Sequence, residues 1–600
     1  MPSNPATLHP QTVMQVLDAS AHLWPNMAAL KAKRGGRWVE TTWRAYREAV
    51  RTTARAFLAL GLEPGKGVAI IGYNSPEWFF ADVGAIFAGG VPAGIYTTSS
   101  AEQCQYIADH CEAQVAVVEN RTHLEKFLAV RGQLPHLKAI VVVDGDGADP
   151  GAGVHAWRDL TQLAEQTPEA ALDARIAAQK AEDVATLIYT SGTTGNPKAV
   201  MITHDNITWT AQTALQLIDL RPGEVVLSYL PLSHVAEQLV SIHGPMVAGV
   251  TTCFAESLEA LPENLREIRP HAFLGVPRVW EKIQAKMQAI GAAQPPLRKK
   301  IASLAKRIGL AAGRADQHGT RKPWLYPIAK KFIFDRIRER LGLDRCRYQV
   351  TSAAPISRDT LAYFLSLGIP LFEIYGMSEC TGPATVSLPH AYRTGSTGTA
   401  LPGTELTIAP DGEICMRGRH VFKGYLKNAE ATAEALDADG WLHSGDIGEL
   451  DTAGFLRITD RKKDLLITAG GENVAPQLLE GLLKGIPVIA QAVVVGDRRK
   501  YLAALVTLDP ERLPVDAAAA GSAARTPAEA ANCKVFLGWL DREVARLNQR
   551  LAQVQTIKRV KVLPNELTVE AGELTPTMKL KRKVINARHA DAIAALYPDG

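Results

Sequence analysis

Ten consecutive residues, Tyr189-Thr190-Ser191-Gly192-Thr193-Thr194-Gly195-Asn196-Pro197-Lys198, have the composition of a loop that binds a polyphosphate. The hydroxyl side chains and backbone N–H groups can donate hydrogen bonds to phosphate oxygens, and Lys198 adds a positive charge. Gly192 and Gly195 permit positive φ and let a ligand approach the backbone closely. The loop is not a Walker A motif, because Pro197 precedes the lysine and no Gly-Lys-Ser/Thr follows. A surface linker is the alternative interpretation, since clusters of Ser, Gly and Thr are usually linkers.

The segments on either side of this loop favour phosphate binding over a linker. The apolar run at 184–188 is too short for a helix and predicts a buried parallel strand. An amphipathic stretch follows at 205–218 and predicts a helix. The strand, the terminal Pro197-Lys198 pair and this helix together indicate a structured loop.

Strand and helix signals alternate along the first part of the chain, up to about residue 180. The strand signals fall at 67–72, 115–118 and 138–143, and the helix signals fall at 76–88 and 101–111. After the loop, strand signals continue at 225–230, 251–254 and 272–276. This alternation predicts an α/β fold with mainly parallel sheets and flanking helices.

Two changes of pattern predict further units toward the C-terminus. From 395 to about 457, short strands broken by Gly, Pro and Asp predict a small β-rich subdomain. The polar bridge Asp460-Arg461-Lys462-Lys463-Asp464 then leads into a new αβ pattern. We therefore predict a large N-terminal domain at 1–460 and a smaller mobile α+β domain at 461–600. Within the smaller domain, 516–524 predicts an exposed insertion and 528–553 predicts a helix.

The composition excludes several classes of protein. A length of 600 residues exceeds one core, and 46% hydrophobic residues are enough for large buried cores. The net charge of +4 is too small to indicate nucleic-acid binding. The seven cysteines lack Cys-x-x-Cys spacing, which argues against a zinc site or a disulfide framework and suits a reducing compartment. Without a signal peptide or a long apolar run, the sequence predicts a cytoplasmic protein, or at most a peripheral membrane protein.

The helical region at 297–347 is rich in Lys and Arg and poor in acidic residues. Two interpretations of this region stay open. It is a solvated helical face, the common role of such charge runs. Alternatively, it is a surface attracted to anionic membrane lipid or to the phosphates of a nucleotide-bearing cofactor.

Six further segments carry residues suited to nucleotide chemistry. They are Leu230-Pro231-Leu232-Ser233-His234-Val235-Ala236-Glu237, Thr351-Ser352-Ala353-Ala354-Pro355, Glu373-Ile374-Tyr375-Gly376-Met377-Ser378-Glu379, Trp441-Leu442-His443-Ser444-Gly445-Asp446-Ile447-Gly448, Thr459-Asp460-Arg461-Lys462-Lys463-Asp464 and Leu574-Thr575-Pro576-Thr577-Met578-Lys579-Leu580-Lys581-Arg582. With the loop at 189–198, they resemble the adenylate-forming enzymes: acyl-CoA synthetases, luciferases and the adenylation domains of peptide synthetases. The segments occur in the same order as in that superfamily.

The resemblance implies a site for ATP. Ala353, Ala354 and Pro355 would let a purine lie against backbone, and Tyr375 would stack on it. Asp446 would accept hydrogen bonds from the ribose hydroxyls. The other positions that the resemblance assigns to the nucleotide or the thiol substrate are Thr190, Ser191, Gly192, Thr193, Thr194, Gly195, Lys198, Glu373, Gly376, Ser378, Arg461, Lys463, Gly470 and Gly471. Of these, Lys463 lies near the hinge of the C-terminal domain, and Gly470 and Gly471 either line a thiol tunnel or form a solvated loop.

The resemblance also implies the groups that act on the reacting atoms. Glu379, with Thr190, would bind Mg²⁺, and Lys198 would hold phosphate oxygens. His234 would lie near the substrate carboxylate, although a histidine at a strand end is more often a structural hydrogen-bonding residue. Lys579 matches the lysine that enters the site for the first half-reaction. Met578 stands where many members carry Gly, and Lys581 lies two residues on, so Lys581 stays an alternative.

Two segments indicate the class of acid. One segment resembles long-chain fatty acyl-CoA synthetases: Phe273-Leu274-Gly275-Val276-Pro277-Arg278-Val279-Trp280-Glu281-Lys282. Another resembles their bubblegum-type branch: Gly195-Asn196-Pro197-Lys198 followed by Thr203-His204-Asp205-Asn206-Ile207-Thr208-Trp209. The implied function is activation of a long-chain fatty acid by ATP and Mg²⁺, followed by transfer to coenzyme A. The alternatives are another carboxylic acid, a carrier-protein acceptor, a luciferase-like oxidase and a silent lipid-binding relative. The sequence predicts no oligomeric state.

Overall fold

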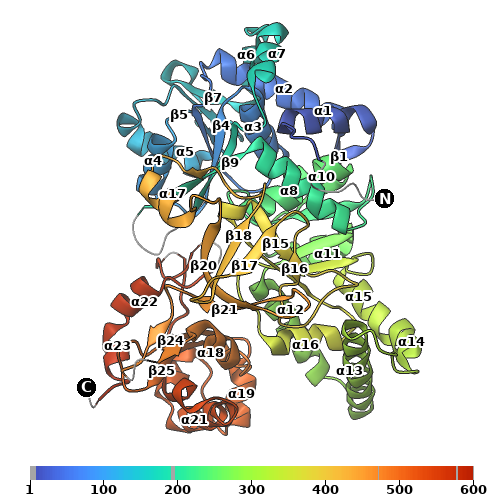
Figure 1. Cartoon of the computed structure of the whole chain (residues 1–600), viewed down its shortest axis with the longest axis vertical. Coiled ribbons are helices and arrows are strands. Elements are labelled where there is room, and N and C mark those ends of the chain that lie inside the picture. The colour runs from blue at the N-terminus through green and yellow to red at the C-terminus, as the bar shows by residue number, and fades with distance from the viewer. Residues whose placement is uncertain (1–7, 191–195, 470–471, 570, 576–578, 599–600) are drawn as a thin grey trace.

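The structure, a computed structural model, describes residues 8–190, 196–469, 472–569, 571–575 and 579–598. The predicted site residues outside these ranges are Ser191, Gly192, Thr193, Thr194, Gly195, Gly470 and Gly471. The N-terminal part of the chain forms the upper body of the molecule, and two lobes extend below it (Figure 1). The C-terminal residues form one lobe, and helices from the middle of the chain form the other (Figure 1).

The sheet that carries both ends of the predicted phosphate loop has the order β19-β9-β8-β4-β3-β5-β6-β7. Its strands are β3 (Gly67–Ile71), β4 (Val91–Ile95), β5 (Ala113–Val118), β6 (Ala139–Val142), β7 (Val154–Ala156), β8 (Val184–Thr190), β9 (Lys198–Thr203) and β19 (Gly424–Tyr425). The strands from β8 to β7 are parallel, whereas β9 and β19 run antiparallel to their neighbours. In this register Thr190 pairs with Lys198, so the β8–β9 hairpin presents the loop.

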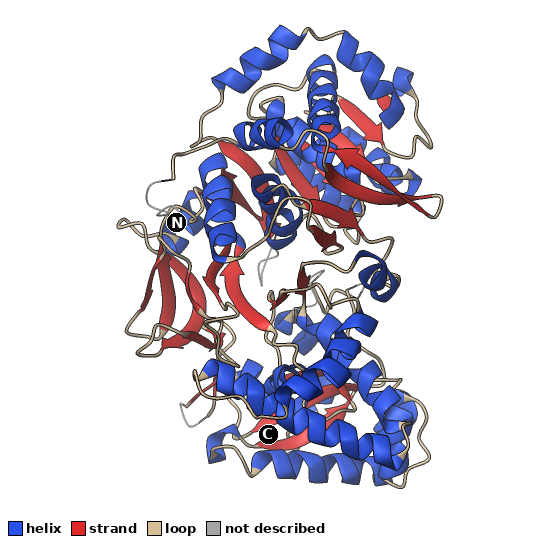
Figure 2. Cartoon of the chain, turned by 90° about the vertical axis from the view of Figure 1, so that its right-hand side faces the viewer, coloured by secondary structure: helices blue, strands red, loops and turns tan. Residues whose placement is uncertain are grey.

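Both faces of this sheet are buried. In β3, Val68 and Ile70 belong to one core cluster, and Ala69 and Ile71 belong to another on the opposite face. The first face packs against α2 (Trp43–Ala59) and α3 (Pro76–Phe87), and the second against α4 (Ala101–His110) and α5 (Arg121–Val130). Because a strand buried on both faces favours apolar residues at every position, β3 and β6 are uninterrupted apolar runs. Helices also lie against the strands in the side view (Figure 2).

A second large sheet has the order β16-β15-β14-β13-β12-β10-β11-β1-β2. Its strands are β1 (Ala28–Arg34), β2 (Arg37–Thr42), β10 (Val225–Ser228), β11 (Thr251–Phe254), β12 (Ala272–Gly275), β13 (Tyr348–Thr351), β14 (Phe372–Met377), β15 (Gly382–Val386) and β16 (Thr399–Ala400). The strands from β14 to β1 are parallel. Parallel strands end at the same edge of a sheet, so the predicted segments that follow β10, β13 and β14 lie close together.

The predicted β-rich subdomain contains an antiparallel sheet in the order β17-β18-β20-β21. Its strands are β17 (Glu405–Ile408), β18 (Glu413–Arg417), β20 (Leu442–Leu450) and β21 (Leu456–Arg461). The register sets Asp446 of β20 directly opposite Arg461 of β21. Side chains opposite each other in an antiparallel pair lie on the same face, which brings these two predicted site residues together.

The C-terminal lobe is an α+β domain around a sheet of β24 (Ile489–Val495), β25 (Leu502–Leu508) and β26 (Ile557–Val562), so the predicted fold class is confirmed. Two local predictions here differ from the structure. The stretch 516–524 is exposed only in part: residues 518, 519, 521 and 523 are exposed, but Ala517, in α19 (Leu513–Ala519), and Ala524 pack into the domain core. The helix predicted at 528–553 is two helices, α20 (Pro527–Asn532) and α21 (Lys534–Asn548), separated at Cys533, whose backbone is extended.

The second lower lobe is helical. It contains α12 (Pro277–Ala292), α13 (Pro296–Gln317), α14 (Tyr326–Ala329), a π-helical turn (Lys330–Phe334) and α15 (Asp335–Leu341). Ala305 of α13 packs against Ala329 and Phe334, which joins α13 to the α14 segment. Within the described ranges, no helix combines the length and the apolarity needed to cross a lipid bilayer.

Candidate active site

A cavity of about 1600 Å³ lies where the two large sheets, the β-rich subdomain and the C-terminal lobe meet. The predicted site residues in its lining are Thr190, Lys198, His234, Ala353, Gly376, Ser378, Glu379, Arg461, Lys463 and Lys579. These residues come from segments spread along most of the chain. Folding therefore gathers the separate predicted segments around one cavity.

Lys198 and Glu379 are connected through an aromatic side chain. The Lys198 Nζ lies 4.9 Å from the centroid of the Tyr425 ring, a cation–π contact. The Tyr425 hydroxyl donates a 2.7 Å hydrogen bond to Oε1 of Glu379. Burial raises the pKa of Tyr425, and the neighbouring Glu379 acts in the same direction, so the phenol stays neutral and donates. The chain Lys198–Tyr425–Glu379 thus positions a cation and a carboxylate on one wall.

Tyr425 is a site residue that the sequence did not indicate. It lies on β19, which pairs with β9 beside Lys198. A strand this short has no periodicity to detect, and its partner strand lies far away in the sequence. The only local signal is Gly424, whose φ of 136° is a conformation that favours glycine. The pairing with β9 alone brings Tyr425 to the site.

Asp446 is nearly buried directly behind the cavity wall. Its Oδ2 accepts a 2.8 Å hydrogen bond from the Tyr375 hydroxyl, and its Oδ1 accepts a 3.1 Å hydrogen bond from Nε of Arg461. Two donors on different oxygens hold the carboxylate in one orientation. An oriented carboxylate can accept hydrogen bonds from paired hydroxyl groups.

Several predicted residues do not line the cavity in this structure: Ala354, Pro355, Glu373, Tyr375 and Asp446. The alternation of side chains along β14 explains two of them. Gly376 faces the cavity, whereas Glu373 and Tyr375 point to the other face. Tyr375 therefore supports Asp446, and its stacking on a purine stays a prediction. Glu373 accepts a 2.8 Å hydrogen bond from the Gly395 N–H, and burial raises the pKa of Glu373 to about 8.

Backbone hydrogen bonds hold Lys579 at the cavity. An antiparallel bridge joins Leu574 to Leu580, and the Lys579 N–H donates a 2.9 Å hydrogen bond to Oγ1 of Thr575. Lys581 also lines the cavity, and its N–H donates to the carbonyl of Glu573. The backbone on both sides of Lys579 is thus held by hydrogen bonds.

Lys579 lies among charged groups from three parts of the fold. Burial and the positive charge of Arg461 lower the pKa of Lys579 to about 8, while Asp446 and Glu379 act in the opposite direction. His234 lines the same cavity, and burial together with the charge of Lys579 lowers its pKa to about 4. The imidazole Nδ1 accepts a 3.2 Å hydrogen bond from the backbone N–H at the start of α9 (Val235–Gln238). His234 is therefore a neutral ring with a fixed orientation.

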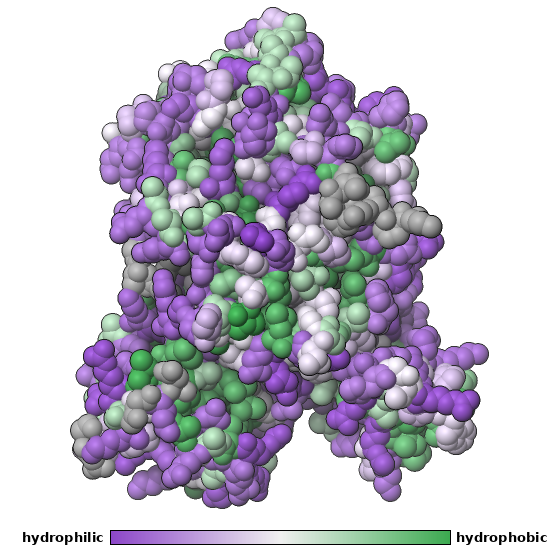
Figure 3. Space-filling view, viewed as in Figure 1, coloured by the Kyte–Doolittle hydropathy of each residue, from purple (hydrophilic) through white to green (hydrophobic). Residues whose placement is uncertain are grey.

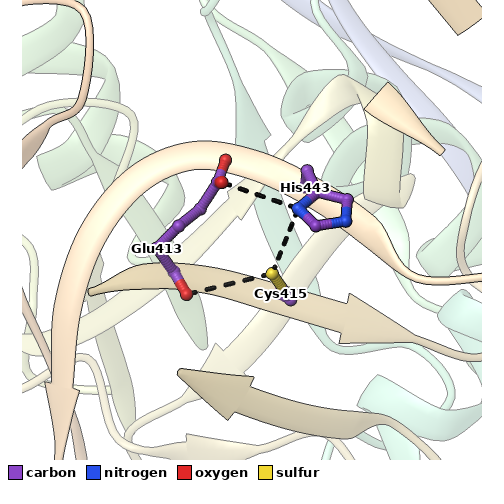
Figure 4. Close-up of side chains that lie close together, drawn as sticks. All are labelled: Glu413, Cys415 and His443. Carbon is purple, nitrogen blue, oxygen red and sulfur yellow. Dashed lines mark hydrogen bonds and ion pairs between the residues drawn. The ribbon is translucent and has the colours of Figure 1, made fainter. Parts of the chain in front are cut away.

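Glu413, Cys415 and His443 form a cluster at the cavity edge (Figure 4). Cys415 and His443 face each other across β18 and β20. The Sγ atom of Cys415 lies 3.5 Å from Nδ1 of His443, and the same Nδ1 lies 3.5 Å from Oε2 of Glu413. The ammonium of Lys462 lies 2.9 Å from the same Oε2 and supplies its counter-charge. Burial raises the pKa of Cys415 to about 11, so the thiol is protonated. We interpret this cluster as a polar network that ties Lys462 to the subdomain.

A long part of the cavity wall is apolar. It lies between α8 (His204–Leu217) and the second sheet, and its side chains include Ala214, Leu217, Val226, Phe273, Val350 and Val386. The strands β10, β12 and β13 are parallel, and their carboxyl ends reach the polar residues of the cavity. Val226 and Tyr348, near the starts of β10 and β13, therefore lie at the opposite end of the cavity. The cavity thus joins a polar end to an apolar channel, which suits a ligand with a charged head and a hydrocarbon tail.

The fold and the site define the class of AMP-binding enzymes. Residues 17–426 match the family model described as AMP-binding enzyme, and residues 463–600 match the model described as AMP-binding enzyme C-terminal domain. The chain belongs to the AMP-binding enzyme family.

Full-length relatives confirm the predicted resemblance to long-chain fatty acyl-CoA synthetases. The long-chain-fatty-acid–CoA ligase ACSBG2 of Xenopus laevis is 44% identical over 628 residues, which cover 100% of this chain and 85% of that protein. The long-chain-fatty-acid–CoA ligase ACSBG1 of Mus musculus is 40% identical, with 99% of this chain and 86% of that protein covered.

Solved structures share the fold at lower sequence identity. The anthranilate CoA ligase AuaEII in complex with anthranoyl-AMP has a TM-score of 0.74 at 19% identity, covering 98% of this chain and 99% of that one. The A domain of carboxylic acid reductase from Segniliparus rugosus in complex with AMP has a TM-score of 0.74 at 22% identity, covering 99% and 95%. These similarities establish the two-domain adenylate-forming architecture of this chain.

Proposed function

We propose that the protein is an ATP-dependent long-chain fatty acid–CoA ligase. Relatives named as such ligases support this function over the full length of the chain. The observation that carries it is one cavity that joins an apolar channel to a polar end containing Lys198, Glu379 and Lys579. A fatty acid has the matching form, since each methylene buried in such a channel contributes about 0.8 kcal/mol and needs no polar partner.

The reaction has two steps at the same carbonyl group. In the first, a carboxylate oxygen attacks the α-phosphorus of ATP, and pyrophosphate leaves with the electron pair of the broken P–O bond. In the second, the sulfur of coenzyme A attacks the acyl carbon of the acyl-adenylate, AMP leaves, and the thiol loses its proton. The protein contributes mainly by positioning the reactants and neutralising phosphate charge.

The residues at the polar end have separate roles in this proposal. Lys579 stabilises the charge that develops between the incoming carboxylate and the α-phosphate, with His234 beside it. Lys198 holds the β- and γ-phosphates, together with the loop that precedes it. Asp446, oriented by Tyr375 and Arg461, accepts hydrogen bonds from the ribose.

Glu379 and Thr190 would hold Mg²⁺. Both line the cavity, and carboxylate and hydroxyl oxygens are the hard ligands that this ion prefers. The Tyr425 hydroxyl donates to one oxygen of Glu379, which orients the carboxylate. The ion would neutralise charge on the phosphate oxygens.

We further propose that residues 461–600 form a lid on the domain at 1–460, which includes the β-rich subdomain at about 395–457. The separate family match of 463–600 supports a distinct unit. Lys463, which lines the cavity, lies where this lid would turn. The turn would exchange Lys579 for Gly470 and Gly471 beside the acyl group before the thiol attacks.

The substrate also bears on the basic region at 297–347. Long-chain fatty acids partition into lipid bilayers, and cations near an anionic bilayer surface are attracted to it. We include a peripheral contact between this region and anionic membrane lipid in the proposed function.

The test separates the half-reactions. We expect purified protein with ATP and magnesium to release pyrophosphate with long-chain fatty acids in a panel that also contains aromatic and short acids. Lys579→Ala should slow acyl-adenylate formation about 100- to 1000-fold, while thioester formation from supplied acyl-AMP changes little. Lys581→Ala is the matched control and should retain most of the first step. If no acid in the panel yields an acyl-adenylate, the proposal is wrong. If the acyl group is transferred only to a carrier protein, the acceptor is that protein and not coenzyme A.

A further inference from the structure

The helical lobe exposes an unusual concentration of apolar side chains. Among the described residues, six of the seventeen large apolar side chains that are exposed to solvent fall between 297 and 332. They are Leu297, Ile301, Leu304, Trp324, Ile328 and Phe332. Trp324 is 82% exposed and Leu297 is 70% exposed. Single exposed apolar residues are ordinary, but a group of them marks an interaction surface.

These side chains belong to two helical segments that pack together. Leu297, Ile301 and Leu304 recur at the spacing that places side chains on one face of α13. Ile328 and Phe332 are one turn apart on the α14 segment, and Trp324 precedes them. The two segments pack together through the buried side chains of Ala305, Ala329 and Phe334. The lobe that they form stands apart from the C-terminal lobe and carries both apolar and polar surface (Figure 3).

The charge of the same segment is strongly positive. Residues 296–334 contain ten Lys and Arg residues and one acidic residue, Asp316. Among the described residues, only two of these ten cations have an acidic partner: Lys322 pairs with Asp316, and Lys330 pairs with Asp335. Lys299, Lys300 and Lys331 are exposed beside the apolar residues.

We infer that this lobe is a docking surface for an anionic lipid bilayer, an inference that rests on the proposed fatty acid substrate. Lys and Arg would contact lipid phosphates while the apolar side chains enter the boundary between headgroups and acyl chains, where Trp is favoured. A second copy of the chain fits less well, because a twofold interface would bring the ten cations of each copy together. Nucleic acid would leave the apolar side chains without a partner.

The position of the lobe fits delivery of the substrate from the bilayer. A smaller hollow of about 460 Å³ lies on the inner side of the lobe, against Gly309, Gly313 and Tyr326. Tyr348 and Phe372 line both this hollow and the main cavity. The lobe that carries the surface is therefore next to the apolar end of the cavity, where the far end of an acyl chain would lie.

Vesicle binding tests the surface independently of catalysis. We expect the full chain to co-sediment with vesicles of phosphatidylcholine and phosphatidylserine, more weakly as salt is raised, and much less with phosphatidylcholine alone. Lys299→Gln with Lys300→Gln should weaken binding about 30-fold, at roughly 1 kcal/mol per cation. Trp324→Ala with Ile328→Ser and Phe332→Ser should also release the protein. The matched apolar control is Leu23→Ser with Val515→Ser and Val535→Ser, which removes exposed side chains elsewhere.

The catalytic readout separates this inference from the proposed ligase activity. Both surface variants should release pyrophosphate normally when the fatty acid is supplied from albumin, and slowly when it is supplied in anionic vesicles. Wild-type protein that does not bind anionic vesicles, or surface variants that bind as wild type does, would overturn the inference. Surface variants that change the molecular mass in light scattering would overturn it too, because the occupant would then be a second copy. Normal vesicle binding without any acyl-adenylate formation would refute only the proposed ligase activity.

Discussion

The charge of Lys579 depends on pH in a range where most lysines do not titrate. Its burial beside Arg461 lowers the pKa to about 8, so the ammonium form predominates below pH 8 and the neutral amine predominates above it. Only the ammonium form can stabilise negative charge between the acid and ATP. For adenylate formation we expect kcat/KM to fall as pH rises through about 8, because kcat/KM reports the free enzyme.

The control is Lys579→Arg, whose guanidinium stays charged throughout this range. In this variant kcat/KM for adenylate formation should not decline near pH 8, whatever its maximal rate. A wild-type profile that stays flat up to pH 10, or an unchanged decline in the arginine variant, would contradict the assignment.

Tyr425 gives a second prediction at the scale of one residue. Tyr425→Phe keeps the ring beneath Lys198 but removes the hydrogen bond to Glu379. Hydrogen bonds to charged groups contribute about 1.5–3 kcal/mol, so we expect kcat/KM for ATP to fall at least tenfold. A titration of pyrophosphate release with magnesium should show a higher requirement for the ion. Tyr501→Phe, which removes a 2.8 Å hydrogen bond to a carbonyl in the C-terminal domain, should change neither value.

At the scale of elements, a buried ion pair anchors the segment that follows Lys579. Arg582, at the start of α22 (Arg582–Arg588), lies 2.7 Å from Oε2 of Glu480 on α18 (Pro476–Leu483), and both side chains are nearly buried. The other oxygen of Glu480 accepts a 2.7 Å hydrogen bond from the Val494 N–H. This arrangement joins α18, β24 and α22.

Glu480→Leu should therefore destabilise the C-terminal domain by about 3 kcal/mol, because it removes the closer acidic partner of Arg582 and leaves Asp464, whose carboxylate lies 3.8 Å from the guanidinium. Native-state hydrogen exchange of the β24 and β25 amides measures the local free energy of opening. The double substitution Glu480→Leu with Arg582→Met should recover part of the loss. If the double variant is less stable than the sum of the two single variants, the pair does not act as described.

Element types could be predicted because the patterns are local. The apolar runs at 67–72 and 251–254 and the helical pattern at 76–88 correspond to β3, β11 and α3, since burial on both faces leaves a signal in consecutive residues. The helix predicted at 528–553 breaks at Cys533 instead. There the extended backbone is set by packing against the domain core, which no local pattern records.

At the scale of the whole molecule, the cavity limits the acyl chain. Ala214 lies on α8 in the apolar wall, and a larger side chain there would occupy space that the chain needs. Excluding about three methylenes costs about 2.4 kcal/mol, so Ala214→Phe should lower kcat/KM for palmitate roughly 60-fold. Octanoate serves as the internal control and should react nearly as with wild type. Equal losses for both acids would mean that the substitution disturbs the fold and not the channel.

The sequence by itself determined the class of chemistry, and it singled out Lys198, Glu379 and Lys579, which the fold gathers around one cavity. It could do so because hydroxyl-rich loops, carboxylates and lysines in a fixed order are local features. Only the tertiary structure decided which side chains meet. Strand pairing brought Tyr425 to the site, and the alternation of side chains in β14 turned Tyr375 away from the cavity. The direction in which a side chain points and the extent of its burial depend on neighbouring residues in the fold, and those neighbours are distant in the sequence.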